Sequence, residues 1–193
     1  MNTAVMESAE HAKQYGFWTY LMSDAIIFAL LFATYGTMTG NLAGGPGGGD
    51  LFELGNSLYE TVFLLLSTLT CGLAMTALQT NAKNAVIPWL LVTLCFGIGF
   101  IAMEVSEFND LVSIGAGPSR SGFLSAFFTL VGTHGLHVTV GILWLLVMIG
   151  QIIDKGLTHP VVSRLYRFSL FWHFLDLIWI AIFSVVYLPG VLA

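Results

Sequence analysis

Long runs of apolar residues dominate the pattern along this chain, and short polar or glycine-rich stretches separate them. The apolar runs lie at about residues 17–39, 58–79, 86–108, 122–152 and 167–188. Each run reaches the roughly 20 residues that a helix needs to cross the hydrocarbon core of a bilayer. The pattern therefore predicts an all-α, polytopic membrane protein, in which five transmembrane helices form one bundle and residues 1–193 form a single domain.

Composition supports this membrane class and argues against others. Hydrophobic residues make up 56% of the 193 residues and charged residues only 9%, whereas soluble domains carry about 25% charged residues. Lysine and arginine total six and form no basic patch. We therefore expect the membrane, and no nucleic acid, among the partners of this chain.

The positions of the basic residues predict the orientation of the chain. An odd number of helices places five of them on one side of the membrane, namely Lys13, Lys83, Lys155, Arg164 and Arg167. Only Arg120 falls on the other side. Because short cytoplasmic loops are enriched in lysine and arginine, we expect a cytoplasmic N-terminus and a periplasmic C-terminus.

Ionisable residues interrupt the first and last apolar runs, where a charged side chain at the helix centre costs about 2.5–3.5 kcal/mol. His173 and Asp176 are three residues apart and so share a helical face. Asp24 lies at a comparable depth, so we expect it to approach His173 or Asp176 if their helices are neighbours. Two interpretations stay open, namely a carboxylate that exchanges protons and a hydrogen-bonded lock between helices.

The fourth apolar run carries His134 and His137, three residues apart and close to mid-membrane. One interpretation is a haem-binding membrane anchor or electron carrier that uses His134, His137 and His173, because histidine is a common haem ligand. The other is hydrogen bonding between helices. We favour the second, since no further ligand cluster is visible, and we predict no metal, cofactor or catalytic residue in this chain.

Glu60 and Glu104 lie near the outer ends of the second and third runs. Their side chains can reach the interface by snorkelling, so we expect contacts with lipid head groups or with a partner's arginine, or else solvated helix ends. Trp18, Trp89 and Trp172 lie near the inner ends of their helices and fit an interfacial aromatic belt.

Several segments together carry a specific set of motifs. The segments are Gly16–Asp24, Arg120–Phe128, Gly132–Val138 and Phe171–Asp176. In combination they resemble subunit III of the haem-copper terminal oxidases, nearly from end to end. Phe52–Leu54 and Gly99–Glu104 are similar to the branch of bacterial cytochrome o ubiquinol oxidases.

The resemblance implies a place in the aerobic respiratory chain of the bacterial inner membrane. It implies a complex that oxidises ubiquinol, reduces dioxygen and pumps protons, with haems and copper in subunit I. Subunit III of that family is a V-shaped bundle that packs on subunit I, holds phospholipid, and is thought to support proton uptake and sustained turnover. Many relatives have seven helices and a glutamate where this chain has Asp24, so the resemblance leaves the detailed role of Asp24 open.

Overall fold

The computed structural model describes residues 3–51, 54–80 and 82–192, and all regular secondary structure within these residues is helical. The long helices are α1 (Thr3–Met38), α3 (Leu54–Gln79), α4 (Lys83–Ser113), α5 (Gly122–Lys155) and α6 (His159–Ile182). The shorter elements are α2 (Gly48–Leu51), the π-helix η1 (Phe183–Tyr187) and α7 (Leu188–Leu192). Five helices are long and apolar enough to cross a membrane, which confirms the predicted fold class. Phe52 and Glu53, which contribute to the resemblance, lie outside the described residues.

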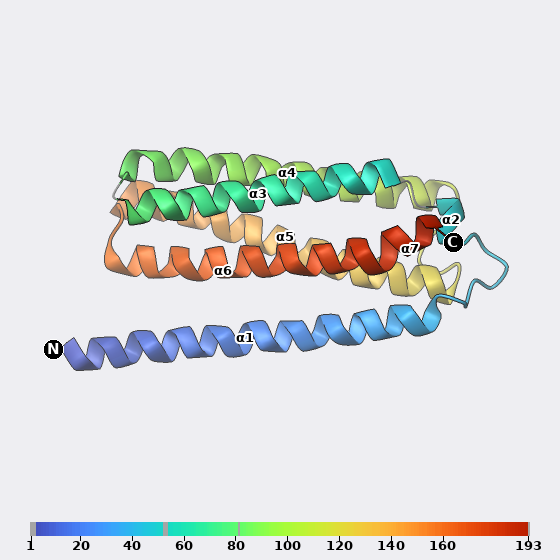
Figure 1. Ribbon diagram of the computed structural model, residues 1–193, viewed down its shortest axis with the longest axis horizontal. Helices are drawn as coiled ribbons and strands as arrows, with labels where there is room; N and C mark the ends of the chain where they lie inside the picture. Colours follow the sequence, from blue (N-terminus) through green and yellow to red (C-terminus); the bar gives the residue numbers. More distant parts are fainter. Residues whose placement is uncertain (1–2, 52–53, 81, 193) are drawn as a thin grey trace.

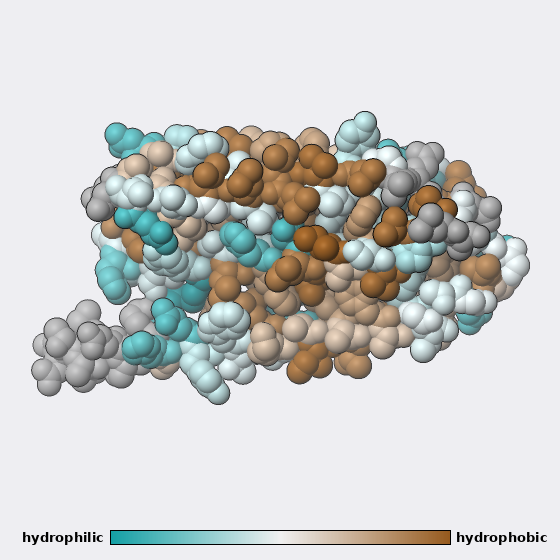
Figure 2. Space-filling model, viewed as in Figure 1, coloured by the Kyte–Doolittle hydropathy of each residue, from teal (hydrophilic) through white to brown (hydrophobic). Residues whose placement is uncertain are grey.

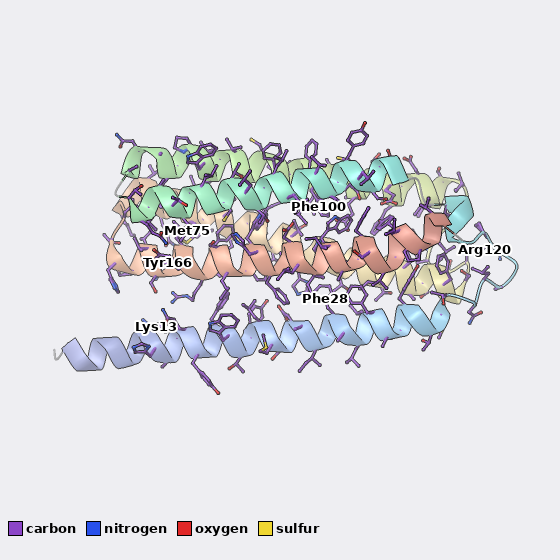
Figure 3. The ribbon with its side chains drawn as sticks, in the orientation of Figure 1. Lys13, Phe28, Met75, Phe100, Arg120 and Tyr166 are labelled. Atoms are coloured by element: carbon purple, nitrogen blue, oxygen red, sulfur yellow. The ribbon has the colours of Figure 1, made fainter. Side chains whose placement is uncertain are left out.

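The long helices alternate in direction along the chain (Figure 1). Helices α3, α4, α5 and α6 pack on one another and close a four-helix bundle. Helix α1 lies along one side of it, against α5 and less extensively against α6. The two termini lie at opposite ends of the molecule. Lys13 and Arg120 lie at these two opposite ends in Figure 3, as the distribution of basic residues predicted. Which of the two ends faces the cytoplasm stays a prediction.

The outer surface of the bundle is apolar over most of its length. Figure 2 shows hydrophobic side chains over the middle of one face and mostly hydrophilic ones toward its ends. On α5, the outward residues Leu136, Val140 and Leu143 are 51–63% exposed. Side chains of this kind suit contact with lipid or with another membrane protein.

Several helices extend beyond the apolar runs that predicted them. Helix α1 begins at Thr3 instead of near residue 17, because residues 3–16 are rich in alanine, glutamate, lysine and glutamine, which favour helix. Its 36 residues give a length of about 54 Å, more than the roughly 30 Å of hydrocarbon. Helix α6 begins at His159, with Pro160 in its first turn, where proline is tolerated. Helix α5 ends before Gly156, whose φ of 65° favours glycine.

Trp172 fastens α6 to the neighbouring helices. It is 2% exposed, and its indole Nε1 donates a hydrogen bond to Ser67 Oγ of α3 at 2.7 Å. The ring lies close to Gly97 of α4 and Gly141 of α5, where an added Cβ would come within 3.1 and 2.8 Å of it. The expectation that Trp172 belongs to an interfacial belt is therefore wrong. Trp18, in contrast, is 51% exposed, which is compatible with such a belt.

Candidate functional site

Asp24 and His137 meet in the interface between α1 and α5. Asp24 is 5% exposed, and its Oδ2 lies 3.7 Å from Nε2 of His137. The other ring nitrogen of His137, Nδ1, lies 2.7 Å from the carbonyl oxygen of Thr133. Since a carbonyl only accepts hydrogen bonds, Nδ1 carries the hydrogen and donates it. The imidazole therefore turns Nε2 toward the carboxyl group.

At 3.7 Å the two atoms lie beyond hydrogen-bond distance, and Asp24 Oδ2 has no hydrogen-bond partner among the described residues. A carboxylate facing an unprotonated Nε2 would set two acceptors against each other. A proton carried by either group would remove this conflict. Because imidazole and carboxyl groups are common proton carriers, the pair can take up a proton inside the bundle or pass it on. Tyr20, one turn earlier on α1, also interacts with the Asp24 carboxyl group.

The partner of Asp24 differs from the one expected. The depth of Asp24 matched that of His173 and Asp176, but α1 packs more extensively on α5 than on α6. The imidazole within 4 Å of Asp24 is consequently that of His137. Similar depth in a bundle is therefore not enough to identify a partner, because it says nothing about which helices are neighbours.

His173 and Asp176 form a separate polar group on α6. His173 Nδ1 lies 2.7 Å from the carbonyl oxygen of Ser169, one turn earlier. Asp176 is 6% exposed, and it interacts with His173 and with Thr68 of α3. The shared face predicted from the spacing of His173 and Asp176 is thus observed, and it turns toward α3.

His134 lies in the centre of the bundle, among aromatic rings from several helices. It is completely buried, and its ring packs against Trp179, Phe100 and Phe28 with centroid distances of 5.3, 5.8 and 6.3 Å. Phe28 points from α1 toward the bundle, and Phe100 lies between the helices (Figure 3). Neither ring nitrogen of His134 has a hydrogen-bond partner among the described residues.

The three histidines do not form a ligand set. His137 faces α1, His134 lies among aromatic rings and His173 bonds to its own helix. Within residues 3–51, 54–80 and 82–192, no three histidine, cysteine, aspartate or glutamate side chains converge to hold a metal ion. The histidines present therefore do not fit a haem or copper site.

Glu60 and Glu104 lie inside the bundle, so the expectation that they snorkel to the interface is wrong. Glu60 is 1% and Glu104 3% exposed. Their helices continue past the apolar runs, which moves both carboxyl groups inward from the helix ends. Glu107 lies with them, and Tyr187 Oη donates a hydrogen bond to its Oε2 at 2.8 Å. Helical spacing alone does not predict this contact, because η1 changes the rotation of the chain just before Tyr187.

Comparison with known proteins identifies the family. A family model described as cytochrome c oxidase subunit III matches residues 3–191. The chain belongs to the cytochrome c oxidase subunit III family. With five helices of membrane length, this subunit III homologue is a multi-pass membrane protein, and the resemblance found in its motifs is confirmed.

Curated relatives of this subunit III homologue include proteins of quinol oxidases. Cytochrome bo(3) ubiquinol oxidase subunit 3 of Pseudomonas putida is 56% identical over 177 residues, which cover 92% of this chain and 86% of the relative. The protein of that name from Pseudomonas aeruginosa is 54% identical over 178 residues, covering 92% and 85%. Quinol oxidase subunit 3 of Bacillus subtilis is 42% identical over 175 residues, covering 91% and 86%.

Proposed function

We propose that this chain is the accessory subunit III of a proton-pumping ubiquinol oxidase in the bacterial inner membrane. It packs on the catalytic subunit I, which holds the haems and copper, and contacts other oxidase subunits and phospholipid. Its N-terminus faces the cytoplasm and its C-terminus the periplasm. Its contribution is to support proton uptake and sustained turnover while the redox chemistry takes place in the neighbouring subunit.

The buried Asp24–His137 pair is the observation that carries this proposal. Two side chains of a chemical type that can carry protons lie close together between α1 and α5, and neither residue belongs to a converging set of metal ligands in the described chain. The names of the relatives support a quinol oxidase in particular. The outward apolar residues of α1, such as Ile26 at 62% and Leu30 at 64% exposure, support extensive contact with lipid and neighbouring subunits.

A haem-binding anchor or electron carrier is the competing function. It would need two or three of His134, His137 and His173 to reach one iron. The geometry opposes this, because the ring of His134 packs against Trp179 at 5.3 Å while Nε2 of His137 faces Asp24 at 3.7 Å. A large rotation of both side chains, and loss of both contacts, would be required.

Purification in mild detergent separates the two functions. A tagged copy of the chain should co-purify with a larger haem-containing subunit, and the visible spectrum should follow that subunit. Replacing His134, His137 or His173 singly by alanine should leave the haem bands of any assembled complex in place. A stoichiometric haem band that stays with the isolated chain and disappears in these variants would refute the proposal.

A further inference from the structure

We propose that Glu60, Glu104 and Glu107, together with Tyr187, form a second buried site, which takes up water and exchangeable protons. We call these four residues the carboxyl cluster. The start of α3, the end of α4 and the segment just before α7 lie toward the end of the bundle that carries the C-terminus (Figure 1). The cluster is separate from the Asp24–His137 pair between α1 and α5. The inference concerns the chemistry of these side chains alone and does not depend on the proposed oxidase function.

Different elements bring the cluster together. Glu60 comes from α3, Glu104 and Glu107 come from α4, and Tyr187 is the last residue of η1. Tyr187 is completely buried; it donates to Glu107 Oε2 at 2.8 Å and lies within electrostatic reach of all three carboxyl groups. The π-helix that positions Tyr187 is a local irregularity of the kind often found at functional sites.

Some of the buried carboxyl oxygens of the cluster lack hydrogen-bond partners, although Glu107 accepts a hydrogen bond from Tyr187. In the described part of the chain, both oxygens of Glu104 and Oε2 of Glu60 are buried without one. The Glu104 carboxyl group rests on the backbone of α5 at Gly135, where an added Cβ would overlap it. Polar atoms buried in this way are costly unless something bonds to them. These carboxyl oxygens therefore call for a polar partner.

Charge identifies protons as one part of that ligand. An unpaired ionised carboxylate in a protein interior costs several kcal/mol, and three of them repel one another. The groups that face the cluster are glutamates from α3 and α4 and the tyrosine of η1, with His134 beside Gly135 on α5. No lysine or arginine is among them. Protons are then the positive charges that neutralise the carboxyl groups.

Geometry identifies water as the other part. Among the described residues, no three acidic or histidine side chains form a group that could hold a metal ion. A neutral carboxylic acid has one donor and further acceptor capacity. Water can bond to several such groups at once, as buried waters with two to four polar partners do. Glu107 lies about 9 Å along α4 from its end at Ser113, which places the cluster within reach of the adjacent aqueous phase.

Infrared spectroscopy of the purified protein, with whatever chains co-purify, tests this site. Neutral carboxylic acids have a carbonyl band that ionised carboxylates lack, and the band shifts in D2O when the proton exchanges. Difference spectra between wild type and Glu60→Gln or Glu104→Gln should show the loss of such an exchange-sensitive band. Asp110→Asn is the matched control, because Asp110 is exposed near the end of the same helix; it should leave that band unchanged.

Tyr187→Phe provides a second test that changes no carboxyl group. It removes the hydrogen bond to Glu107, so one carbonyl band should shift in frequency without being lost. Two results would overturn the proposal. One is the loss of ionised carboxylate bands in the Glu60→Gln and Glu104→Gln spectra; the other is a neutral-acid band that does not respond to D2O. If Glu104→Gln does not accumulate, Glu60→Gln still shows whether a neutral-acid band or ionised carboxylate bands are lost. Tyr187→Phe still shows whether a carbonyl band shifts.

Discussion

Replacing Gly141 by alanine should destabilise the bundle, because Trp172 occupies the space that a side chain would need. A Cβ at position 141 would lie 2.8 Å from Cζ3 and 3.1 Å from Cε3 of Trp172, and 3.3 Å from Phe171 Cε1. The indole cannot easily move away, since Gly97 of α4 lies close to its Cη2 and Cζ2 atoms and its Nε1 is bonded to Ser67 at 2.7 Å.

The expected size of this effect follows from packing. Forcing an extra methyl group into a filled interior costs about 1–3 kcal/mol. Alanine also favours helix over glycine by about 1 kcal/mol, so the measured loss in Gly141→Ala should be smaller than the packing penalty itself. Gly150→Ala is the matched control, because Gly150 is exposed on the same helix and nothing lies within 4 Å of its Cβ position. The difference between the two variants isolates the packing penalty.

Thermal unfolding in mild detergent measures this difference. Gly141→Ala should unfold at a lower temperature than Gly150→Ala, by several degrees. Adding Trp172→Phe should reduce the penalty of Gly141→Ala, because the smaller ring leaves room for the methyl group, so the two changes should be non-additive. Equal unfolding temperatures for the two alanine variants would show that Trp172 is not wedged between the helices, and the packing argument would fail.

Three further predictions concern polar contacts. The hydroxyl groups of Thr70 and Thr93 lie 2.9 Å apart between α3 and α4, and a double-mutant cycle with valine should give a coupling of about 0.6 kcal/mol, as hydrogen bonds in membrane bundles do; zero coupling would contradict it. His173→Leu removes the imidazole beside a buried carboxyl group and should lower stability in detergent by about 1–3 kcal/mol, so unchanged unfolding would count against that contact. Asp24→Asn should leave assembly largely intact but slow or shorten oxidase turnover, whereas the exposed Asp154→Asn should match wild type; normal sustained turnover and pumping in Asp24→Asn would remove the functional role of the pair.

The sequence predicted the helices well because their signal is local. Apolar runs of membrane length need no knowledge of the rest of the fold, so all five spanning helices were expected near their observed positions. Their ends were less predictable. Residues 3–16 are polar yet helical, and the α1 helix continues through them by intrinsic propensity.

The contacts of the site were predicted only in part, because they depend on which helices are neighbours. The spacing of His173 and Asp176 was enough to place them on one face. In contrast, the partner of Asp24 could have come from α5 or α6 at the same depth, and packing selects His137. Glu104 looked terminal in the sequence, but α4 continues to Ser113 and carries it into the interior.

The order of synthesis gives the Asp24–His137 pair a consequence for insertion into the membrane. His137 follows Asp24 by about 110 residues, so at roughly 5–20 residues per second the ribosome needs on the order of ten seconds to complete the second partner. During that interval α1 has emerged while the helix that covers its carboxyl group has not. The newly made segment must therefore tolerate, among lipids or translocation machinery, an acidic side chain that lacks its partner on α5 until that helix arrives.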